Sequence, residues 1–394
     1  MISNAFSSPH CFVKSLSSHA WGRALLLCAT LFQIACSGVT TQPERSEEGA
    51  GQGSTDIVAS GSAQRFSIAA VGDIMLGTDY PSDRLAEDSY ALLASVAPVL
   101  QLADVTFGNV EGVLMDGGEA RKRCTNTSRC YVFRSPASYA ETLSRAGFDV
   151  VSLANNHARD FGEEGRDATM QALDGVGIYH SGRTGDIAYW EQDGLRLAMI
   201  AFAPFGGSHD MLDMDGGREL INGVSSKSDI LIVSFHGGAE GADATRVPFA
   251  METFHGEQRG DVVAFARMAV EAGADLVVGH GPHVPRALEL YRGRLIAYSL
   301  GNFATHWGIN VRENNGVAPI LLVTMNGDGD FIEGRIHSNR QQRPVGPQPD
   351  PQHQAARLIR ELTLLDFPAT PLTIDDEGYI KPSPAASTSL GASP

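Results

Sequence analysis

Five apolar runs in this 394-residue chain end in side chains of the types that bind metal ions. The side chains are Asp73 after "FSIAAVG", Asn109 and Glu111 after "DVTFG", Asn155, Asn156 and His157 after "DVVSLA", His236 after "DILIVSF", and His280 and His283 after "ADLVVG". Imidazole, carboxylate and amide oxygen together suit divalent first-row metals such as zinc, manganese or iron. Any one of these residues alone is more simply a cap or turn residue, but five such strand ends in one chain predict a metal site.

The stretch "GHGPHVP" places His280 and His283 on either side of a Gly-Pro pair. Glycine lets the backbone turn closely and proline fixes its own φ, so the turn is expected to be short and rigid. Such a turn could direct two imidazoles at neighbouring ions. A centre of one or two divalent ions could activate a water molecule and hold the oxygens of a phosphoryl group.

Other polar residues near the third motif have simpler interpretations. Glu163, Glu164 and Asp167 are most simply the first turn of a helix, where acidic side chains complement the helix dipole. Asp160 and Gly162 most simply fix the turn before that helix. None of these five residues is needed for the predicted metal site.

The elements that position these residues alternate between strands and helices. The apolar runs have strand length and β-branched content, and the amphipathic stretches "PASYAETLSRAGF" and "VVAFARMAVEAG" precede two of them. Each stretch has a glycine helix stop at or next to its end, and an aspartate and a buried strand follow. Runs such as "RLAMIAFA" and "GVAPILLVTMNGDGDFIEGRI" lack helices between them and indicate hairpins. The sequence therefore predicts a mixed α/β domain, with functional groups at the carboxyl ends of its strands.

Composition divides the chain into a folded body and polar ends. Residues 37–63 are rich in Gly, Ser, Thr and Glu and predict a flexible linker. The folded domain is expected over 64–340. A Pro-rich connector and a helix around 355–365, packed on the domain, account for 341–381, and 382–394 reads as a disordered tail.

Residues 1–36 are typical of an export signal. Lys14 and Arg23 supply positive charge. The apolar stretch Ala24–Ala35 has the length of the hydrophobic region of a signal peptide and is too short to span a bilayer comfortably. Cys36 follows in "QIACSG", which resembles a bacterial lipobox, so we expect this cysteine to be lipidated. Plain cleavage at this point or an uncleaved anchor is the alternative. The expected location is the cell envelope, on the periplasmic or outer-membrane side if the cell is Gram-negative.

Cys124 and Cys130 lie close together in "RKRCTNTSRCYV". Outside the cytoplasm, a disulfide that closes this short loop is the natural interpretation. A zinc site is disfavoured because a CxxC pair has tighter spacing and a second such pair is missing from the sequence.

The composition is that of a globular protein, with 43% hydrophobic and 19% charged residues and a formal net charge of -16. At roughly 100–200 residues per domain, this length allows one large domain or two smaller ones. An acidic surface offers no electrostatic footprint for nucleic acid, which is therefore not expected as a partner. An anionic partner would need a local cationic centre, which a bound metal ion could supply.

Together the motifs resemble the bacterial capsule-synthesis CapA family, the poly-γ-glutamate capsule proteins of the calcineurin-like metallophosphoesterase superfamily. The matching stretches are "VGDIMLG", "FGNVEGVL", "SLANNHARDFGEEG", "SFHGGAEG" and "GADLVVGHGPHVPRALELYRGRLIAYSLGNF". They follow one another in the expected order from about Arg65 to Val323. The resemblance implies a four-layer α/β/β/α sandwich with the site on one edge, and a role in making a capsular or envelope polymer.

The resemblance also implies a set of ligands. Asp73 matches the first ligand aspartate of the superfamily, but the usual histidine two positions later is Met75. The bridging aspartate falls on Asn109, whose neutral amide cannot neutralise two cations as a carboxylate does, and Glu111 is the nearby carboxylate that could replace it. The remaining matches are Asn156, His236, His280 and His283 as metal ligands, and His157 near the phosphate or leaving group.

Two functions are compatible with these residues. An exported, metal-dependent hydrolase or transferase would act on a phosphate ester or on an amide of an envelope polymer, with His157 as general acid or electrostatic stabiliser. Arg159 and Arg286 are candidate partners for an anionic substrate, although a solvated surface arginine is the simpler interpretation of each. Alternatively, a non-catalytic, lipid-anchored accessory protein would bind an anionic capsular polymer, in a capsule-synthesis complex. A structural protein without a site is disfavoured, because ligand-type residues end so many strands.

Overall fold

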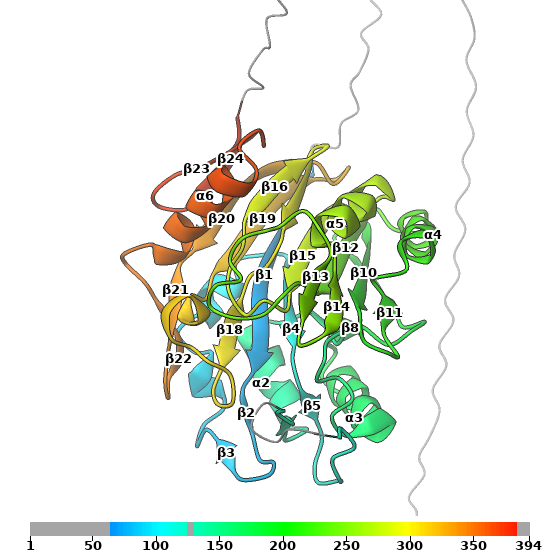
Figure 1. Cartoon of the computed structure of the whole chain (residues 1–394), viewed down its shortest axis with the longest axis vertical. Coiled ribbons are helices and arrows are strands. Elements are labelled where there is room, and N and C mark those ends of the chain that lie inside the picture. Colours follow the sequence, from blue (N-terminus) through cyan, green and yellow to red (C-terminus); the bar gives the residue numbers. More distant parts are fainter. Residues whose placement is uncertain (1–63, 124–129, 384–394) are drawn as a thin grey trace, which may run out of the picture. The chain divides into compact units, whose positions relative to one another are not determined.

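The computed structural model describes residues 64–123 and 130–383, and Figure 1 shows how their helices and strands are arranged. The predicted signal peptide with Cys36, the predicted linker, Cys124 and residues 384–394 lie outside the described residues, so what the sequence predicts for them stays a prediction. In the described part of the chain, no helix combines the length and the apolar content that a membrane crossing requires.

The first sheet has nine strands with β1 (Arg65–Met75) at its centre. On one side, parallel pairing runs from β1 to β4 (Val105–Val110), β7 (Val150–Ser152) and β8 (Tyr179–Ser181). On the other side, antiparallel pairing runs to β19 (Ile320–Asn326), β20 (Phe331–His337), β24 (Tyr379–Pro382) and β23 (Leu372–Ile374). The short strand β18 (Asn302–Thr305) pairs in parallel with the carboxyl end of β1.

The second sheet has seven strands. Its parallel strands are β11 (His209–Asp210), β10 (Leu195–Ala203), β12 (Ile230–His236), β15 (Leu276–His280) and β17 (Arg294–Ala297). Two antiparallel strands complete it, β9 (Ala188–Gln192) beside β10 and β16 (Leu288–Tyr291) beside β17. Each sheet therefore combines parallel strands with antiparallel hairpins, which confirms the prediction of a mixed α/β domain.

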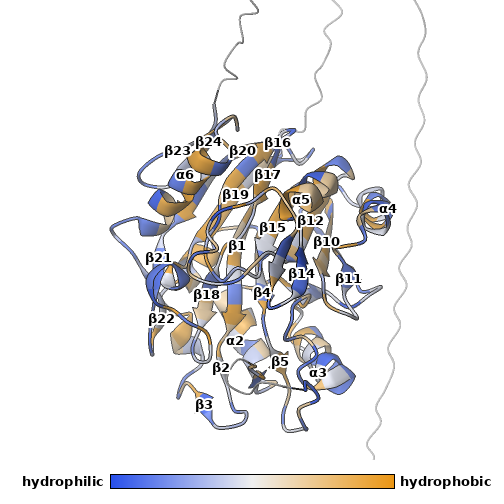
Figure 2. Cartoon of the chain, viewed as in Figure 1, coloured by the Kyte–Doolittle hydropathy of each residue, from blue (hydrophilic) through white to orange (hydrophobic). Residues whose placement is uncertain are grey.

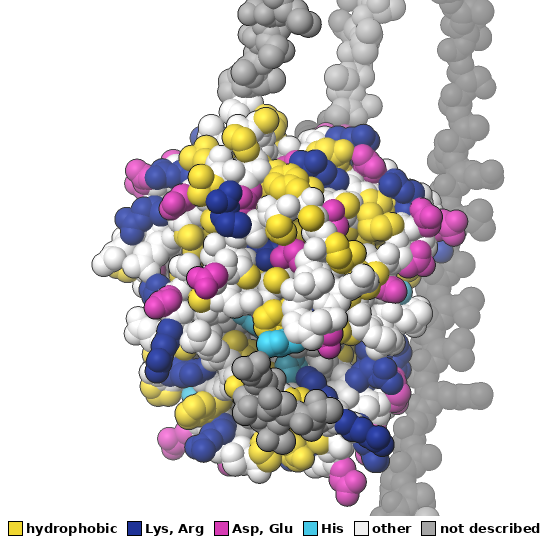
Figure 3. Space-filling view, viewed as in Figure 1, with side chains coloured by type: hydrophobic (Ala, Val, Ile, Leu, Met, Phe, Trp, Pro, Cys, Tyr) yellow, Lys and Arg dark blue, Asp and Glu magenta, His cyan; other side chains and the backbone are white. Residues whose placement is uncertain are grey.

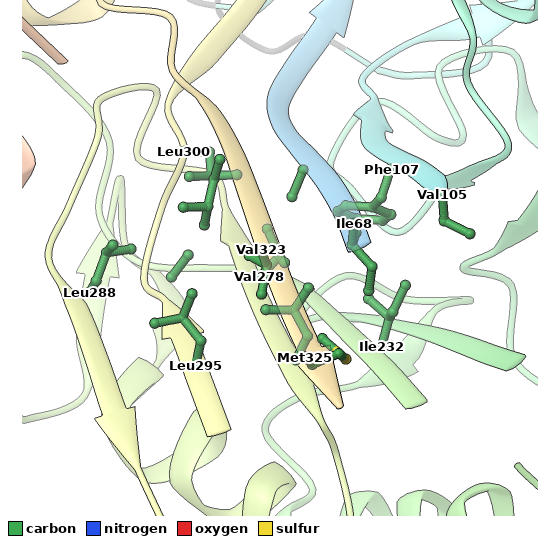
Figure 4. Packing of buried hydrophobic residues seen from close by; sticks show 14 of the residues in the cluster. Ile68, Val105, Phe107, Ile232, Val278, Leu288, Leu295, Leu300, Val323 and Met325 are labelled. Atoms are coloured by element: carbon green, nitrogen blue, oxygen red, sulfur yellow. The ribbon is translucent and has the colours of Figure 1, made fainter. Parts of the chain in front are cut away.

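The two sheets pack face to face around one apolar core. Figure 4 shows Ile68 and Phe107 of the first sheet close to Ile232 and Val278 of the second. Each of these side chains is at most 2% exposed. Because helices or the other sheet cover both faces of these central strands, their sequences are nearly continuous apolar runs rather than alternating ones.

Helices cover the outer face of each sheet. Those on the first sheet are α1 (Ala97–Leu100), α2 (Tyr139–Ala146) and α3 (Gly162–Asp174), and those on the second are α4 (Met214–Ser225) and α5 (Val262–Glu271). The helix α6 (Gln354–Asp366) packs against β16 and β20 and so contacts both sheets. In Figure 2 the hydrophobic colour is concentrated on the strands between these layers. This is a four-layer α/β/β/α sandwich, and the predicted fold class is confirmed.

Helix-ending glycines lead directly into two strands that carry site residues. The helix α2 ends before Gly147, whose φ is 100°, and the chain continues into β7. The helix α5 is followed by Gly273, whose φ is 109°, and then by β15. Such left-handed backbone favours glycine over other residues, so these two glycines fix where each helix ends and where the following strand can begin.

Hairpins occupy much of the remaining chain. The Pro-rich segment that the sequence indicates as an irregular connector includes part of the hairpin between β21 (Asn339–Gln342) and β22 (Gly346–Pro349). Proline is tolerated there because a two-stranded hairpin leaves one edge of each strand unpaired. Other short pairs are β2 (Gly77–Thr78) with β3 (Arg84–Leu85), β5 (Val113–Leu114) with β6 (Arg134–Ser135), and β13 (Glu252–Phe254) with β14 (Glu257–Gly260). The 3-10 helices η1 (Tyr90–Leu92) and η2 (Glu313–Gly316) complete the fold.

Candidate metal centre

Both sheets contribute residues to one site at the carboxyl ends of their parallel strands. Asp73 on β1 is the register partner of Asn109 on β4, in the first sheet. His236 and His280 are register partners and are the last residues of β12 and β15, in the second sheet. All four side chains are fully buried, with no exposed surface. The packing of the two sheets therefore brings together residues that lie far apart in the sequence.

Asp73 is the anionic residue that both histidines of the "GHGPHVP" turn approach. Its Oδ2 lies 3.1 Å from His283 Nδ1, and its Oδ1 lies 3.4 Å from His280 Nδ1. Burial alone would raise the pKa of Asp73, but the close approach of His280, the hydrogen bond from His283 and the positive charge of both histidines outweigh burial and lower the pKa well below its usual range. The carboxylate of Asp73 is therefore ionised at neutral pH and can serve as a ligand.

The turn itself is held in a conformation that residues other than glycine seldom adopt. His283 has a φ of 60° and Gly281 a φ of 111°. The Nδ1 nitrogen of His283 also lies 3.0 Å from Asn302 Oδ1, and the side-chain amides of Asn302 and Asn315 donate to the His283 carbonyl oxygen at 3.2 and 3.0 Å. These contacts fix the ring of His283 with Nε2 toward Glu111 and Glu240.

Glu111 follows β4 and points its carboxylate into the middle of the cluster. Its Oε1 lies 3.7 Å from His283 Nε2 and 4.0 Å from His236 Nε2. Burial raises the pKa of Glu111 to about 8, although the positive charge of His283 opposes the rise. For His283, burial would lower the pKa, but the charges of Glu111 and Asp73 and the hydrogen bond to Asp73 raise it to about 10. Without a cation, these groups keep protons that metal ligands must lose.

Several buried atoms of this cluster that could bind a metal have no hydrogen-bond partner within residues 64–123 and 130–383. The atoms are both carboxylate oxygens of Glu111, the side-chain oxygen of Asn156, Nε2 of His236 and both ring nitrogens of His280. A buried polar atom without a partner is costly, and a concentration of such atoms calls for a missing partner. All of them are atoms that coordinate transition metals. The residues therefore fit a divalent cation, and Asp73, Glu111 and His283 alone place three ligand atoms within 4.8 Å of one another.

Asn109 occupies the bridging position but is already hydrogen-bonded. Its Nδ2 donates to Asp73 Oδ1 at 2.8 Å and lies 3.4 Å from His236 Nδ1, while its Oδ1 accepts from Asn155 Nδ2 at 3.2 Å. In this arrangement the amide orients Asp73. Met75, in place of the usual histidine, is a buried side chain of β1. Whether Asn109 is also a ligand stays a prediction.

His157 belongs to a second group of charged residues beside the cluster. Its Nδ1 lies 2.7 Å from Asp160 Oδ2, and because a carboxylate only accepts, this nitrogen donates the hydrogen bond. Lys122 lies 3.0 Å from Asp160 Oδ1 and donates to the Asn156 carbonyl oxygen at 3.2 Å. Burial lowers the pKa of His157, although the carboxylate of Asp160 opposes that shift. Asp160 therefore does more than fix a turn, since it orients the predicted catalytic histidine.

Glu240 is a site residue that the sequence analysis did not single out. It lies in "HGGAEG", and its Oε2 is 3.9 Å from His283 Nε2. Its Oε1 accepts a hydrogen bond from Arg259 Nη1 at 2.7 Å. The sequence pattern that could have indicated Glu240 is a carboxylate four residues after His236 in a glycine-rich loop.

A cavity of about 800 Å³ opens beside these residues. Its lining residues include Glu111, Asn156, His157, Glu240 and His283, the aromatic residues Tyr131, Phe133, Phe205 and Phe254, the cationic residues Lys122, Arg123 and Arg259, and Cys130 with residues 308–310. In Figure 3 histidine side chains are visible in a hollow of the face shown. The volume is sufficient for a small ligand or a few units of a polymer.

Two arginines named from the sequence do not reach the cluster, and the predicted disulfide is not tested. Arg286 is 1% exposed and forms two 2.8 Å hydrogen bonds with Glu252, so its guanidinium is not available to a substrate. Arg159 is exposed and pairs with Glu163 at 2.8 Å on α3. Cys130 lines the cavity, but Cys124 lies outside the described residues and the disulfide stays a prediction.

Comparison with known families agrees with the motifs and the fold. Residues 67–306 match the family described as bacterial capsule synthesis protein PGA_cap. The match covers more than half of the chain and contains every candidate ligand. The chain belongs to this family, which confirms the resemblance drawn from the motifs.

Curated relatives carry related descriptions. The chain is 27% identical over 331 residues to the PGA biosynthesis protein CapA of Bacillus subtilis, covering 80% of this chain and 82% of the relative. It is 27% identical over 256 residues to the capsule biosynthesis protein CapA of Bacillus anthracis, covering 62% and 61% of the two chains. A probable polyglutamine synthesis accessory protein of Mycobacterium tuberculosis is 29% identical, covering 50% and 55%.

Two solved structures show a weaker likeness. One is a 5'-nucleotidase precursor from Thermus thermophilus, with 12% identity, coverage of 72% of this chain and 56% of that chain, and a TM-score of 0.38. The other is a purple acid phosphatase from yellow lupin, with 11% identity, coverage of 71% and 52%, and a TM-score of 0.37.

Proposed function

We propose that this chain is an exported protein of capsule or envelope polymer biosynthesis that binds one or two divalent cations and hydrolyses a phosphate ester or a polymer amide. The observation that carries the proposal is the cluster of buried ligand-type atoms that have no hydrogen-bond partner among the described residues. The proposed ligands are Asp73, Glu111, Asn156, His236, His280 and His283, with Asn109 as a weaker candidate. Manganese, zinc and iron all suit this mixture of oxygen and nitrogen donors.

The bound cation would polarise the bond to be cleaved and activate water for attack on it. Proton transfer and substrate binding are assigned to side chains of the protein. His157, oriented through Nδ1 by Asp160, lines the cavity, and its imidazolium form would donate the Nε2 proton to a leaving group there. Lys122 holds Asp160 in place and adds positive charge near an anionic substrate.

Export and membrane anchoring are part of the proposal and rest on the sequence. The signal-like residues 1–36 end in Cys36, the predicted site of lipidation. A lipid anchor followed by the linker over residues 37–63 would keep the folded domain near the membrane where envelope polymers are made. The proposed partners are an anionic envelope polymer and other members of a capsule-synthesis complex.

A non-catalytic accessory role is the second candidate, and Asn109 favours it. A neutral amide stands where a bridging carboxylate would neutralise two cations, and Met75 removes another ligand position. A centre reduced in this way could hold one ion that binds an anionic polymer without cleaving it. Binding without turnover distinguishes this role from the hydrolase.

The experiment combines metal analysis with assays of cleavage. Purified wild type and the double variant His280→Ala/His283→Ala are compared for bound metal and for cleavage of a generic phosphodiester and of poly-γ-glutamate with added manganese or zinc. The matched control is His180→Ala/His209→Ala, which removes two histidines that hydrogen-bond elsewhere, His180 to Asp186 and His209 to the Ala201 carbonyl oxygen.

The site variant should lose bound metal and any cleavage while the control keeps both. Equal metal content in the site variant and wild type would contradict the ligand assignment. Metal binding with polymer affinity but without cleavage would favour the accessory role over the hydrolase.

A further inference from the structure

An exposed tryptophan is flanked by two arginines beside the cavity. Trp307 is 44% exposed, and the guanidinium carbons of Arg84 and Arg343 lie 5.1 and 5.5 Å from the centre of its ring. Contact with an aromatic ring holds a guanidinium in place and leaves its N–H groups free to donate. We call these three residues the arginine–tryptophan cluster.

The positive charge of this cluster is not compensated. Within residues 64–123 and 130–383, neither Arg84 nor Arg343 forms an ion pair with a carboxylate. Asp83, next to Arg84 in the chain, instead accepts a hydrogen bond from the Leu85 backbone. Burial lowers the pKa of Arg343, which a bound counter-charge would reverse. Two cations without a carboxylate partner at one tryptophan ring are unusual in a chain with a net charge of -16.

The cluster borders the cavity of the candidate metal centre. Trp307 directly precedes residues 308–310, which line that cavity. Arg343 donates a hydrogen bond from Nη2 to the carbonyl oxygen of Ile309, one of these lining residues. On the cavity side, Lys122 and Arg123 are further cationic lining residues. Cationic side chains therefore lie both among the cavity-lining residues, which also include Glu111, Glu240 and Glu257, and beside Trp307 next to the loop at 308–310.

A cavity of about 800 Å³ encloses only a few units of a polymer, so the rest of a polymeric substrate must leave across its rim. We propose that the arginine–tryptophan cluster is a second subsite, which binds anionic groups of the same polymer chain outside the cavity. Guanidinium groups bind carboxylates and phosphates alike through paired N–H donors. The inference rests on the proposed function only in taking the substrate to be an anionic polymer.

The test compares oligomers of different length. Labelled γ-linked glutamate oligomers are titrated against the protein, one of two units and one of about twelve units. A γ-linked unit has five backbone atoms instead of three, so the long oligomer reaches farther than the roughly 40 Å of an extended twelve-residue α-peptide. A polyphosphate pair of matched lengths forms the second arm. Wild type is compared with Arg84→Ala/Arg343→Ala and with Arg84→Lys/Arg343→Lys. The control Arg145→Ala/Arg335→Ala removes the same charge from two other arginine–aromatic pairs, on Tyr90 and Tyr379.

The alanine variant should bind the long oligomer about tenfold more weakly and the short one as wild type does, because only the long chain reaches the cluster. The lysine variant should recover much of this loss, and the control should stay within about twofold of wild type. If the alanine variant loses affinity only for the long glutamate oligomer, the cluster binds carboxylates. If it loses affinity only for the long polyphosphate, the cluster binds phosphates.

An unchanged affinity of the alanine variant for both long polymers, or an equal loss for short and long oligomers, would overturn the proposal. Thermal unfolding of each variant shows whether a loss of affinity reflects a loss of fold. Repeating the titration after metal removal separates the two proposals, since the length effect of the cluster does not require the ion.

Discussion

The environment of Glu111 favours binding of a cation and lowers the stability of the metal-free protein. The carboxylate of Glu111 is fully buried, and its two oxygens lack hydrogen-bond partners in the part of the chain that the structure describes. Burial raises the pKa of this carboxylate to about 8. An uncharged side chain at this position would avoid the cost of burying a carboxylate. We infer that the cost of burying this carboxylate is offset when a cation binds.

The first prediction concerns Glu111→Gln in the metal-free protein. Because the pKa of Glu111 is about 8 when folded and 4.5 ordinarily, the folded state binds more protons between these pH values, and the free energy of unfolding falls as pH rises through that window. Glutamine does not ionise, so the variant should unfold at a higher urea concentration than wild type at pH 8 and at the same concentration near pH 4.

The same substitution should weaken binding of Mn²⁺ by at least the roughly 10–100-fold that loss of a ligand's hydrogen-bond partner costs. The control is Asp275→Asn, since burial also raises the pKa of Asp275, to about 6, but this residue lies outside the site. Isothermal titration should show wild-type affinity in the control. A Glu111→Gln protein that binds Mn²⁺ as tightly as wild type would remove Glu111 from the ligand set.

The second prediction is that metal binding releases protons at pH 7. In the metal-free protein the pKa of Glu111 is raised to about 8 and that of His283 to about 10, so each holds a proton that a cation must displace. Calorimetry in buffers of different ionisation enthalpy should give about one to two protons released per ion, and affinity should increase as pH rises. A binding enthalpy independent of the buffer would show that these protons are absent.

At the residue scale, the sequence predicted the candidate ligands because ligand-type residues end apolar runs. It did not reveal Glu240 or the role of Asp160, since a residue inside a loop has no periodicity that fixes its direction. The hydrogen bonds that commit Asn109 to Asp73 and Asn155 likewise depend on three strands meeting. Side-chain partners of this kind follow from tertiary packing rather than from local pattern.

The turn after β15 is the element on which the histidine pair depends. Gly281 has a φ of 111°, and a Cβ atom there would lie 2.8 Å from the carbonyl oxygen of Gly237. Gly237 follows His236, so the loops after β12 and β15 pack directly on each other. Their close approach holds His236 and His280 side by side.

The third prediction is that Gly281→Ala lowers both stability and metal affinity. Strained backbone and a steric clash together should cost about 1–3 kcal/mol in the free energy of unfolding, and the shifted histidines should bind Mn²⁺ more weakly. Gly177→Ala is the control, because Gly177 also has a positive φ of 76° but open space around it. Urea unfolding should show a smaller loss in this control, with unchanged Mn²⁺ affinity. Equal behaviour of the two variants would argue against the packing of the two loops as the cause.

At the element scale, the central strands could be predicted from their apolar runs, and the helices α2, α5 and α6 from their helical pattern, with a glycine after α2 and after α5. The hairpin of β21 and β22 could not, since proline in a chain segment usually indicates an irregular structure. The strands β23 and β24 were also missed, because short edge strands after a helix leave little apolar pattern.

At the scale of the whole molecule, the sandwich explains why Asp73 and His283, which are 210 positions apart in the sequence, can share a site. Asp73 and Asn109 come from one sheet, and His236 and His280 come from the other. The sequence predicted convergence at strand ends, but the apolar runs of the two sheets have the same composition and do not show which strands pair. The division of the strands into two facing sheets follows from tertiary packing. It was predicted only through the resemblance to a family whose fold is a sandwich.

The most direct test of the central claim is an anomalous scattering measurement on crystals of the protein grown with Mn²⁺. The account predicts a manganese peak about 2.0–2.3 Å from Glu111 and from at least two of His236, His280 and His283. Saturating Mn²⁺ without a peak among these side chains, or with a peak elsewhere on the protein only, would contradict it.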